Sequence, residues 1–128
     1  MYLYRILGWI VFSLAVFNTC LFIVRQILKR TKWKKLRPAN KIFTKFHRIS
    51  GLLMVVLAPI HGFIALGNIF YWHTGLLAYL FILGLLATYI IGKTIKKMKM
   101  SWRIFHRIVD LLAWVIIIIH LVRPWLFI

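Results

Sequence analysis

The chain has 128 residues, of which 63% are hydrophobic, and its mean hydropathy is +0.90. A water-soluble domain of this size could not bury so much apolar surface, which excludes an ordinary soluble fold. The formal net charge is +17, from 18 Lys and Arg against one acidic residue. The single cysteine, Cys20, excludes a disulfide framework and a cysteine-based metal site.

Four apolar segments predict four membrane helices, at approximately residues 2–24, 46–70, 74–92 and 104–123. Each segment approaches the ~20 residues that an α-helix needs to cross a hydrocarbon layer ~30 Å thick. The first segment has one early charge, Arg5, and no small-residue cleavage site follows it. We therefore expect it to stay as a membrane helix rather than to act as a signal peptide. The predicted fold class is all-α, an integral membrane four-helix bundle that forms a single domain over residues 1–128.

Most basic residues lie in two segments, residues 25–45 between the first two predicted helices and residues 93–103 between the last two. The connection from Gly67 to Gly75 contains neither Lys nor Arg. Because loops rich in Lys and Arg stay on the cytoplasmic side, both basic segments are predicted to be cytoplasmic and both termini to lie outside. Contact with anionic lipid headgroups accounts for the charge, with the docking of an acidic cytoplasmic electron donor as the alternative. Nucleic acid is excluded as a partner, since no binding module accompanies the basic residues.

A repeat with an offset of 59 residues relates residues 46–61 to residues 105–120, with nine identical positions in sixteen. Each copy contains two histidines fourteen residues apart: His47 and His61, and His106 and His120. Fourteen helical residues rise about 21 Å and fall about 40° short of four turns, so both histidines of a copy face one side at two depths. The repeat predicts two similar hairpins, with the second and fourth helices parallel. Pro59 is predicted to bend the second helix near His61.

Parallel helices would bring His47 close to His106 near the cytoplasmic side, and His61 close to His120 further out. Zinc requires four ligands, and neither cysteine nor a carboxylate is available at either depth. Haem iron requires only axial ligands, because the porphyrin supplies the others. We therefore predict two b-type haems, each held by one of these histidine pairs, which carry electrons because their iron has no open position. The alternative is a membrane scaffold or assembly protein in which the histidines only bridge helices.

Three segments resemble the ferric reductase-like transmembrane domain, and they occur in the order found in that family. They are Phe46-His47-Arg48-Ile49-Ser50-Gly51 followed by His61, Trp72-His73-Thr74-Gly75-Leu76-Leu77, and Phe105-His106-Arg107 through His120. The resemblance covers roughly residues 40–122. It implies that electrons move outward from a cytoplasmic flavin, entering at the His47/His106 haem and leaving at the His61/His120 haem.

The chain departs from the family pattern in two respects. Members usually have six membrane helices, and four are predicted here. Many members also carry a flavin- and nicotinamide-binding domain, whereas this chain has no residues left for one and no GxGxxG fingerprint. We therefore expect the membrane subunit of an oxidoreductase in a prokaryotic plasma membrane. It would need a separate cytoplasmic electron donor, such as a flavoprotein, or a quinol, and an external acceptor; a quinol-linked dihaem cytochrome b is the alternative.

Several further polar residues are candidates for the haem surroundings. A guanidinium group suits a carboxylate, so three arginines near the histidines are predicted to bind haem propionates, with anchoring at the membrane interface as the alternative: Arg48, Arg107 and Arg123. Asp110, the only acidic residue, follows His106 by four residues. It is expected to form a salt bridge to Arg103 or Arg107, or else to accept the ring N–H of a haem histidine. His73, in the outer loop, either helps to receive an acceptor or a metal ion or is simply solvated.

Overall fold

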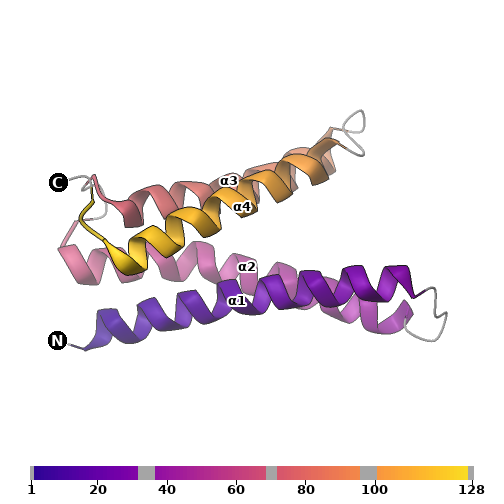
Figure 1. Cartoon of the computed structure of the whole chain (residues 1–128), viewed down its shortest axis with the longest axis horizontal. Helices are drawn as coiled ribbons and strands as arrows, with labels where there is room; N and C mark the ends of the chain where they lie inside the picture. Colours follow the sequence, from indigo (N-terminus) through magenta and orange to yellow (C-terminus); the bar gives the residue numbers. More distant parts are fainter. Residues whose placement is uncertain (1, 32–36, 69–71, 96–100, 127–128) are drawn as a thin grey trace. The chain divides into compact units, whose positions relative to one another are not determined.

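A computed structural model describes residues 2–31, 37–68, 72–95 and 101–126. All the regular secondary structure in these residues is α-helical, which confirms the predicted all-α class. The helices, shown in Figure 1, are α1 (Leu3–Arg30), α2 (Arg37–Leu66), α3 (Thr74–Thr94) and α4 (Ser101–Val122).

All four helices are long and apolar enough to cross a membrane. They contain 21 to 30 residues and are therefore about 31 to 45 Å long, at about 1.5 Å per residue. Few of their residues are buried, and large apolar side chains such as Trp9, Leu111 and Ile118 are exposed. Such an apolar surface is stable in lipid and not in water. The four helices therefore indicate a multi-pass membrane protein.

The helices extend further into the basic segments than their apolar residues predicted. Helix α1 continues to Arg30 instead of ending at residue 24, and α2 begins at Arg37 instead of residue 46. Hydropathy marks only the apolar part of a helix, whereas Lys, Arg, Gln and Leu are good helix formers and continue it. Helix α2 also ends at Leu66, four residues before the predicted end. Gly67 causes this ending, because it adopts the left-handed conformation (φ 70°) and donates its N–H to the Phe63 carbonyl over 2.8 Å.

The chain divides into two compact units, Met1–Ala58 and Pro59–Ile128. The boundary lies inside α2, directly before Pro59. Proline has no backbone N–H and crowds the preceding turn, so a helix is locally weakest where it contains one. The first unit therefore consists of α1 and the larger part of α2, and the second of the last turns of α2 together with α3 and α4.

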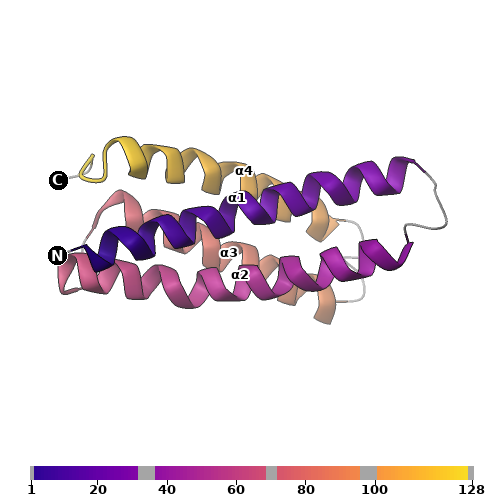
Figure 2. The same ribbon diagram turned by 90° about the horizontal axis from the view of Figure 1, so that it is seen from below.

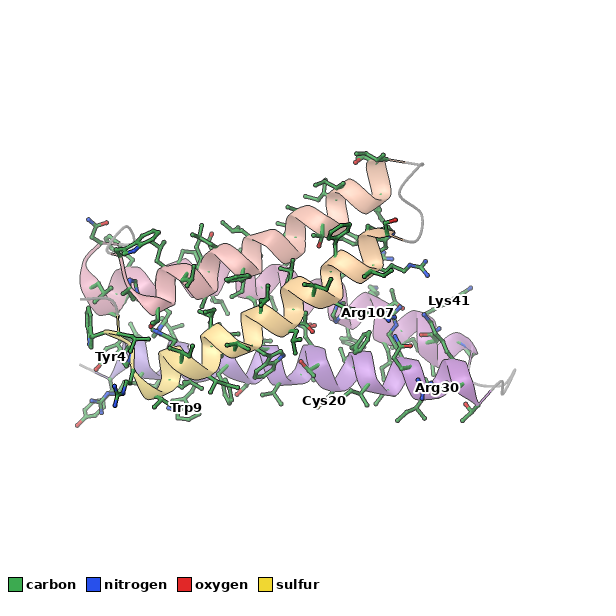
Figure 3. All side chains as sticks on the ribbon, turned by 45° about the horizontal axis from the view of Figure 1, so that its top comes forward. Tyr4, Trp9, Cys20, Arg30, Lys41 and Arg107 are labelled. Carbon is green, nitrogen blue, oxygen red and sulfur yellow. The ribbon has the colours of Figure 1, made fainter. Side chains whose placement is uncertain are left out.

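The first unit is a helical hairpin in which α1 and α2 run in opposite directions (Figure 2). Ser50, 4% exposed, donates a hydrogen bond to Asn18 Oδ1 over 2.7 Å. The Asn18 amide lies 3.3 Å from the sulfur of the buried Met54. Nearer the joined ends of the two helices, where Figure 3 labels Arg30 and Lys41, Arg25 Nε donates to Asn40 Oδ1 over 3.3 Å. Polar groups therefore connect the two apolar helices along their length.

In the second unit, α3 and α4 pack against each other and run in opposite directions (Figure 1). Small residues lie at this contact: Ala113 of α4 is 2% exposed, and Ala78 of α3 is also buried. A Cβ atom at Gly84 would lie 3.4 Å from Val109 Cγ1, at ordinary contact distance. Small side chains let membrane helices approach closely. The close approach brings polar side chains of α3 within hydrogen-bonding distance of histidines on α4.

Candidate functional site

Two of the predicted histidine ligands lie together in the second unit. His61, near the end of α2, and His120, near the end of α4, have ring centroids 6.5 Å apart and ring planes at 80°. Both side chains are half-buried. The two residues are 59 positions apart in the chain, so their proximity is produced by helix packing.

The distance between these two rings suits ligands on opposite sides of one metal ion. A metal–nitrogen bond to imidazole is about 2 Å long and the ring centre lies about 1 Å beyond the nitrogen, so two opposed ligand rings would have centres about 6 Å apart. The observed separation of 6.5 Å is close to this value. Imidazole is a usual ligand of haem iron. The His73 and His120 ring centroids, 6.1 Å apart, meet the same distance, so the repeat and not the distance selects His61 as the partner of His120.

A residue of α3 contacts His120 at its ring nitrogen Nδ1. Thr74, the first residue of α3, is fully buried at 0% exposure, and its Oγ1 lies 2.8 Å from His120 Nδ1. The same hydroxyl donates a hydrogen bond to the Pro124 carbonyl over 2.7 Å. Thr74 therefore joins the beginning of α3 both to the histidine and to the turn that follows α4.

His106 has the same kind of contact near the opposite end of α3. Thr88 Oγ1 lies 2.8 Å from His106 Nδ1 and donates a hydrogen bond to the Leu85 carbonyl over 2.8 Å. The Trp102 ring lies edge-on to His106, with centroids 6.1 Å apart and planes at 75°. Gly92 makes room for Trp102, because a Cβ atom at position 92 would overlap the indole ring. Both histidines of α4 are therefore contacted at Nδ1 by a threonine of α3.

His73 does not behave as a solvated loop residue. It is 8% exposed, and its ring centroid lies 6.1 Å from that of His120 and 6.1 Å from that of Trp125. A Cβ atom at Gly75 would lie 2.6 Å from His73 Nε2 and 2.9 Å from His120 Cε1. Glycine at position 75 therefore lets both imidazoles approach the backbone of α3. The alternative that His73 is solvated is wrong.

The remaining candidates stay predictions. His47 is half-buried on α2 in the first unit, and its pairing with His106 is not tested. The arginines predicted at the haem propionates all have exposed side chains, and Figure 3 labels one of them, Arg107: they are Arg48, Arg107 and Arg123. Asp110 is half-buried and interacts electrostatically with His106, while its salt bridge to Arg103 or Arg107 stays a prediction.

The sequence interpretation missed Thr74 and Thr88 as functional candidates. A signal was present, because these threonines are fourteen residues apart, as are the two histidines of α4. When two helices run in opposite directions, equal spacings place the first residue of one pair beside the second residue of the other. The equal spacing predicts these contacts only when α3 and α4 are known to pack against each other.

Comparison with known proteins identifies no relative of this chain. No protein-family model matches it, and neither a curated protein nor a solved structure matches it significantly. Within the parts of the chain that the structure describes, no group of three or more His, Cys, Asp or Glu is arranged to hold a metal ion. The functional argument therefore depends on the residues themselves and on the paired arrangement of the histidines.

Proposed function

We propose that this protein is a membrane cytochrome that holds two b-type haems between histidine pairs and transfers electrons across the bilayer. The observation that carries the proposal is that His61 and His120, which occupy the same position in the two copies of the repeat, lie together with ring centroids 6.5 Å apart. It supports an outer haem whose iron is held by these two imidazoles. The hydrogen bond at His120 Nδ1 supports the same assignment, because it leaves Nε2 as the nitrogen available to a metal.

The repeat supports a second, inner haem between His47 and His106. Each of these histidines lies fourteen residues before an outer one on the same helix, a rise of about 21 Å. His106 has the same threonine contact as His120, which is expected if both have the same role. His106 and His120 would therefore hold the two groups at positions about 21 Å apart along α4.

The chemistry follows from the ligand set. Haem supplies a reversible one-electron couple, and two imidazoles on the same iron leave no position for a substrate. The histidines of the chain would therefore orient the two groups and hold them at two depths. An electron entering on one side of the membrane would leave on the other without chemistry at the metal.

The distribution of charge supports an orientation for this transfer. The basic segments between α1 and α2 and between α3 and α4 favour the cytoplasmic side, which places both termini outside. The His47/His106 site is then the entry and the His61/His120 site the exit. The resemblance to ferric reductase-like domains supports the same direction in a prokaryotic plasma membrane. A separate flavoprotein or a quinol would donate the electrons, and an external acceptor would receive them.

Haem stoichiometry in histidine variants tests the proposal. The purified protein should bind two haems per chain and show sharp α-band and Soret changes on reduction. Single replacement of any of the four histidines by Ala should leave one haem. The double variant His61→Ala/His120→Ala should also leave one, because both residues serve the same haem, whereas His61→Ala/His106→Ala should leave none.

His73→Ala is the matched control, because this buried histidine lies as close to His120 as His61 does but is not assigned as a ligand. It should keep both haems. A protein without haem absorbance would contradict the proposal and favour a scaffold. Loss of both haems from His61→Ala/His120→Ala, or retention of one in His61→Ala/His106→Ala, would contradict the assigned pairs.

A further inference from the structure

The two threonines of α3 and the two histidines of α4 form matched contacts at two levels of the second unit. Thr74 contacts His120 and Thr88 contacts His106, each with 2.8 Å between the hydroxyl oxygen and Nδ1. Both contacts use the same ring nitrogen and the same type of hydroxyl. The two threonines therefore contact the two histidines in the same way, which indicates that they have the same role. The assignment of the histidines as haem ligands does not by itself explain that role.

The direction of each hydrogen bond follows from the number of hydrogens. A threonine hydroxyl has one hydrogen and can accept through its lone pairs, and a carbonyl oxygen can only accept. Thr74 donates its hydrogen to the Pro124 carbonyl, and Thr88 donates its hydrogen to the Leu85 carbonyl. Each hydroxyl oxygen is then left as an acceptor toward the histidine. With both contacts of each hydroxyl made as hydrogen bonds, the ring nitrogen is the donor, Nδ1–H.

We propose that Thr74 and Thr88 are positioning residues that hold His120 and His106 in the Nδ1–H tautomer and so direct Nε2, with its lone pair, to a haem iron. A neutral imidazole has one N–H, so a hydrogen on Nδ1 leaves Nε2 as the free donor nitrogen. The metal-binding part of this inference rests on the proposed haem function. The tautomer follows from the hydrogen bonds alone.

The surroundings of the threonines favour persistent hydrogen bonds. Thr74 is fully buried and Thr88 is half-buried, on helices whose outer surface is apolar. Hydrogen bonds in series strengthen one another, so a hydroxyl that donates to a carbonyl is a better acceptor for the imidazole N–H. A hydrogen bond from the distal N–H also makes a ligating imidazole more basic. The more basic ligand stabilises ferric iron, so the threonines should lower the midpoint potentials of the two haems.

Substitution of each threonine by Val or Ser separates the hydroxyl from the shape of the side chain. Thr74→Val and Thr88→Val remove the acceptor with little change in volume, and Thr74→Ser and Thr88→Ser retain it. Thr94→Val is the matched control, because Thr94 lies on the same helix and its exposed hydroxyl donates to the Ile90 carbonyl. Two readouts are needed: nitrogen-15 NMR of the histidine rings in the full-length protein without haem, and haem affinity and midpoint potential in the loaded protein.

The unmodified protein should show Nδ1–H and a bare Nε2 at both histidines. Each Val variant should lose this preference at one histidine, bind the corresponding haem about 10- to 100-fold more weakly, and raise its midpoint potential. The Ser variants and Thr94→Val should resemble the unmodified protein. Nε2–H at either histidine in the unmodified protein would overturn the inference. Val variants with unchanged haem affinity and potential would overturn it as well.

The two proposals fail in distinguishable ways. A protein that binds no haem, yet has Nδ1–H at both histidines, would overturn the haem function together with the assigned purpose of the tautomer, while the hydrogen-bond directions would stand. A protein that binds two haems whose properties do not respond to either Val substitution would overturn only the positioning role of the threonines.

Discussion

The two hairpins have related sequences but join their helices with different side chains. In the first unit, Ser50 and Asn18 form the buried hydrogen bond between α1 and α2. The position that corresponds to Ser50 in the repeat is Val109, which packs against Gly84. The second unit instead has polar contacts at its two histidines, through Thr74 and Thr88.

The 59-residue offset places Ala15 and Lys29 of α1 at the positions of Thr74 and Thr88. Neither side chain has a hydroxyl group. The repeat therefore extends to the histidines but does not extend to the threonines that contact them in the second unit. The two hairpins therefore share their histidines. The hydrogen bonds between the helices of each hairpin come from different side chains at positions that the repeat does not relate.

The substitution Gly75→Ala should have the largest effect, because it disturbs the histidine contacts of the second unit directly. The added methyl group would lie within 3 Å of ring atoms of both His73 and His120. Overpacking of this kind costs about 1–3 kcal/mol, which corresponds to about 5- to 150-fold weaker binding at the proposed outer haem. Titration of the purified variant with haem measures this loss.

Gly51→Ala serves as the control for Gly75→Ala, because a Cβ atom at position 51 meets nothing within 4 Å. Its affinity for haem at the two proposed sites should equal that of the unmodified protein. Unchanged outer-haem affinity in Gly75→Ala would mean that the position of His120 does not depend on its close approach to α3.

A smaller effect is expected from Gly92→Ala, at the other end of the α3–α4 contact. The new methyl group would overlap Trp102, which must then move away from His106. The effect on the histidine is smaller than at Gly75, because the methyl group reaches His106 only through Trp102, whereas at position 75 it meets a histidine ring directly. Tryptophan fluorescence should shift, and the inner haem should bind more weakly than the outer one. Equal weakening of haem binding at both proposed sites would mean that the substitution disturbs the whole α3–α4 contact and not only the surroundings of His106.

The smallest of the three effects is expected in the first unit, from Ser50→Ala. Removal of its hydrogen bond to Asn18 should lower the free energy of unfolding by about 0.6 kcal/mol, the average for such bonds between membrane helices. Unfolding in detergent mixtures measures the change, with Ser13→Ala as the control because Ser13 is exposed on α1. Both haems should be retained. Loss of a haem in Ser50→Ala would show that this contact also supports a histidine.

Much of the helical architecture was predictable because it depends on local properties of the chain. Backbone groups in lipid must be hydrogen-bonded within their own helix, so long apolar segments become helices whatever surrounds them. The errors lie at the helix ends. Charged residues up to Arg30 and from Arg37 stay helical, and Gly67 ends α2 before its apolar residues do. Both effects arise from propensity and backbone conformation, which hydropathy does not measure.

In the candidate site, too, the local features were predictable and the features that depend on helix packing were not. The spacing of fourteen residues placed the two histidines of each helix on one face, because helical periodicity is determined by sequence alone. Helix packing then brings His61 beside His120. The burial of His73 and the contacts of Thr74 and Thr88 were not predictable in this way. They depend on which face of α3 meets α4 and on how closely Gly75 and Gly92 let the helices and their rings approach. The sequence by itself determined four helices and the spacing of the two histidines on each of α2 and α4. The tertiary structure decided which threonine contacts each histidine of α4, because those contacts depend on how α3 packs against α4.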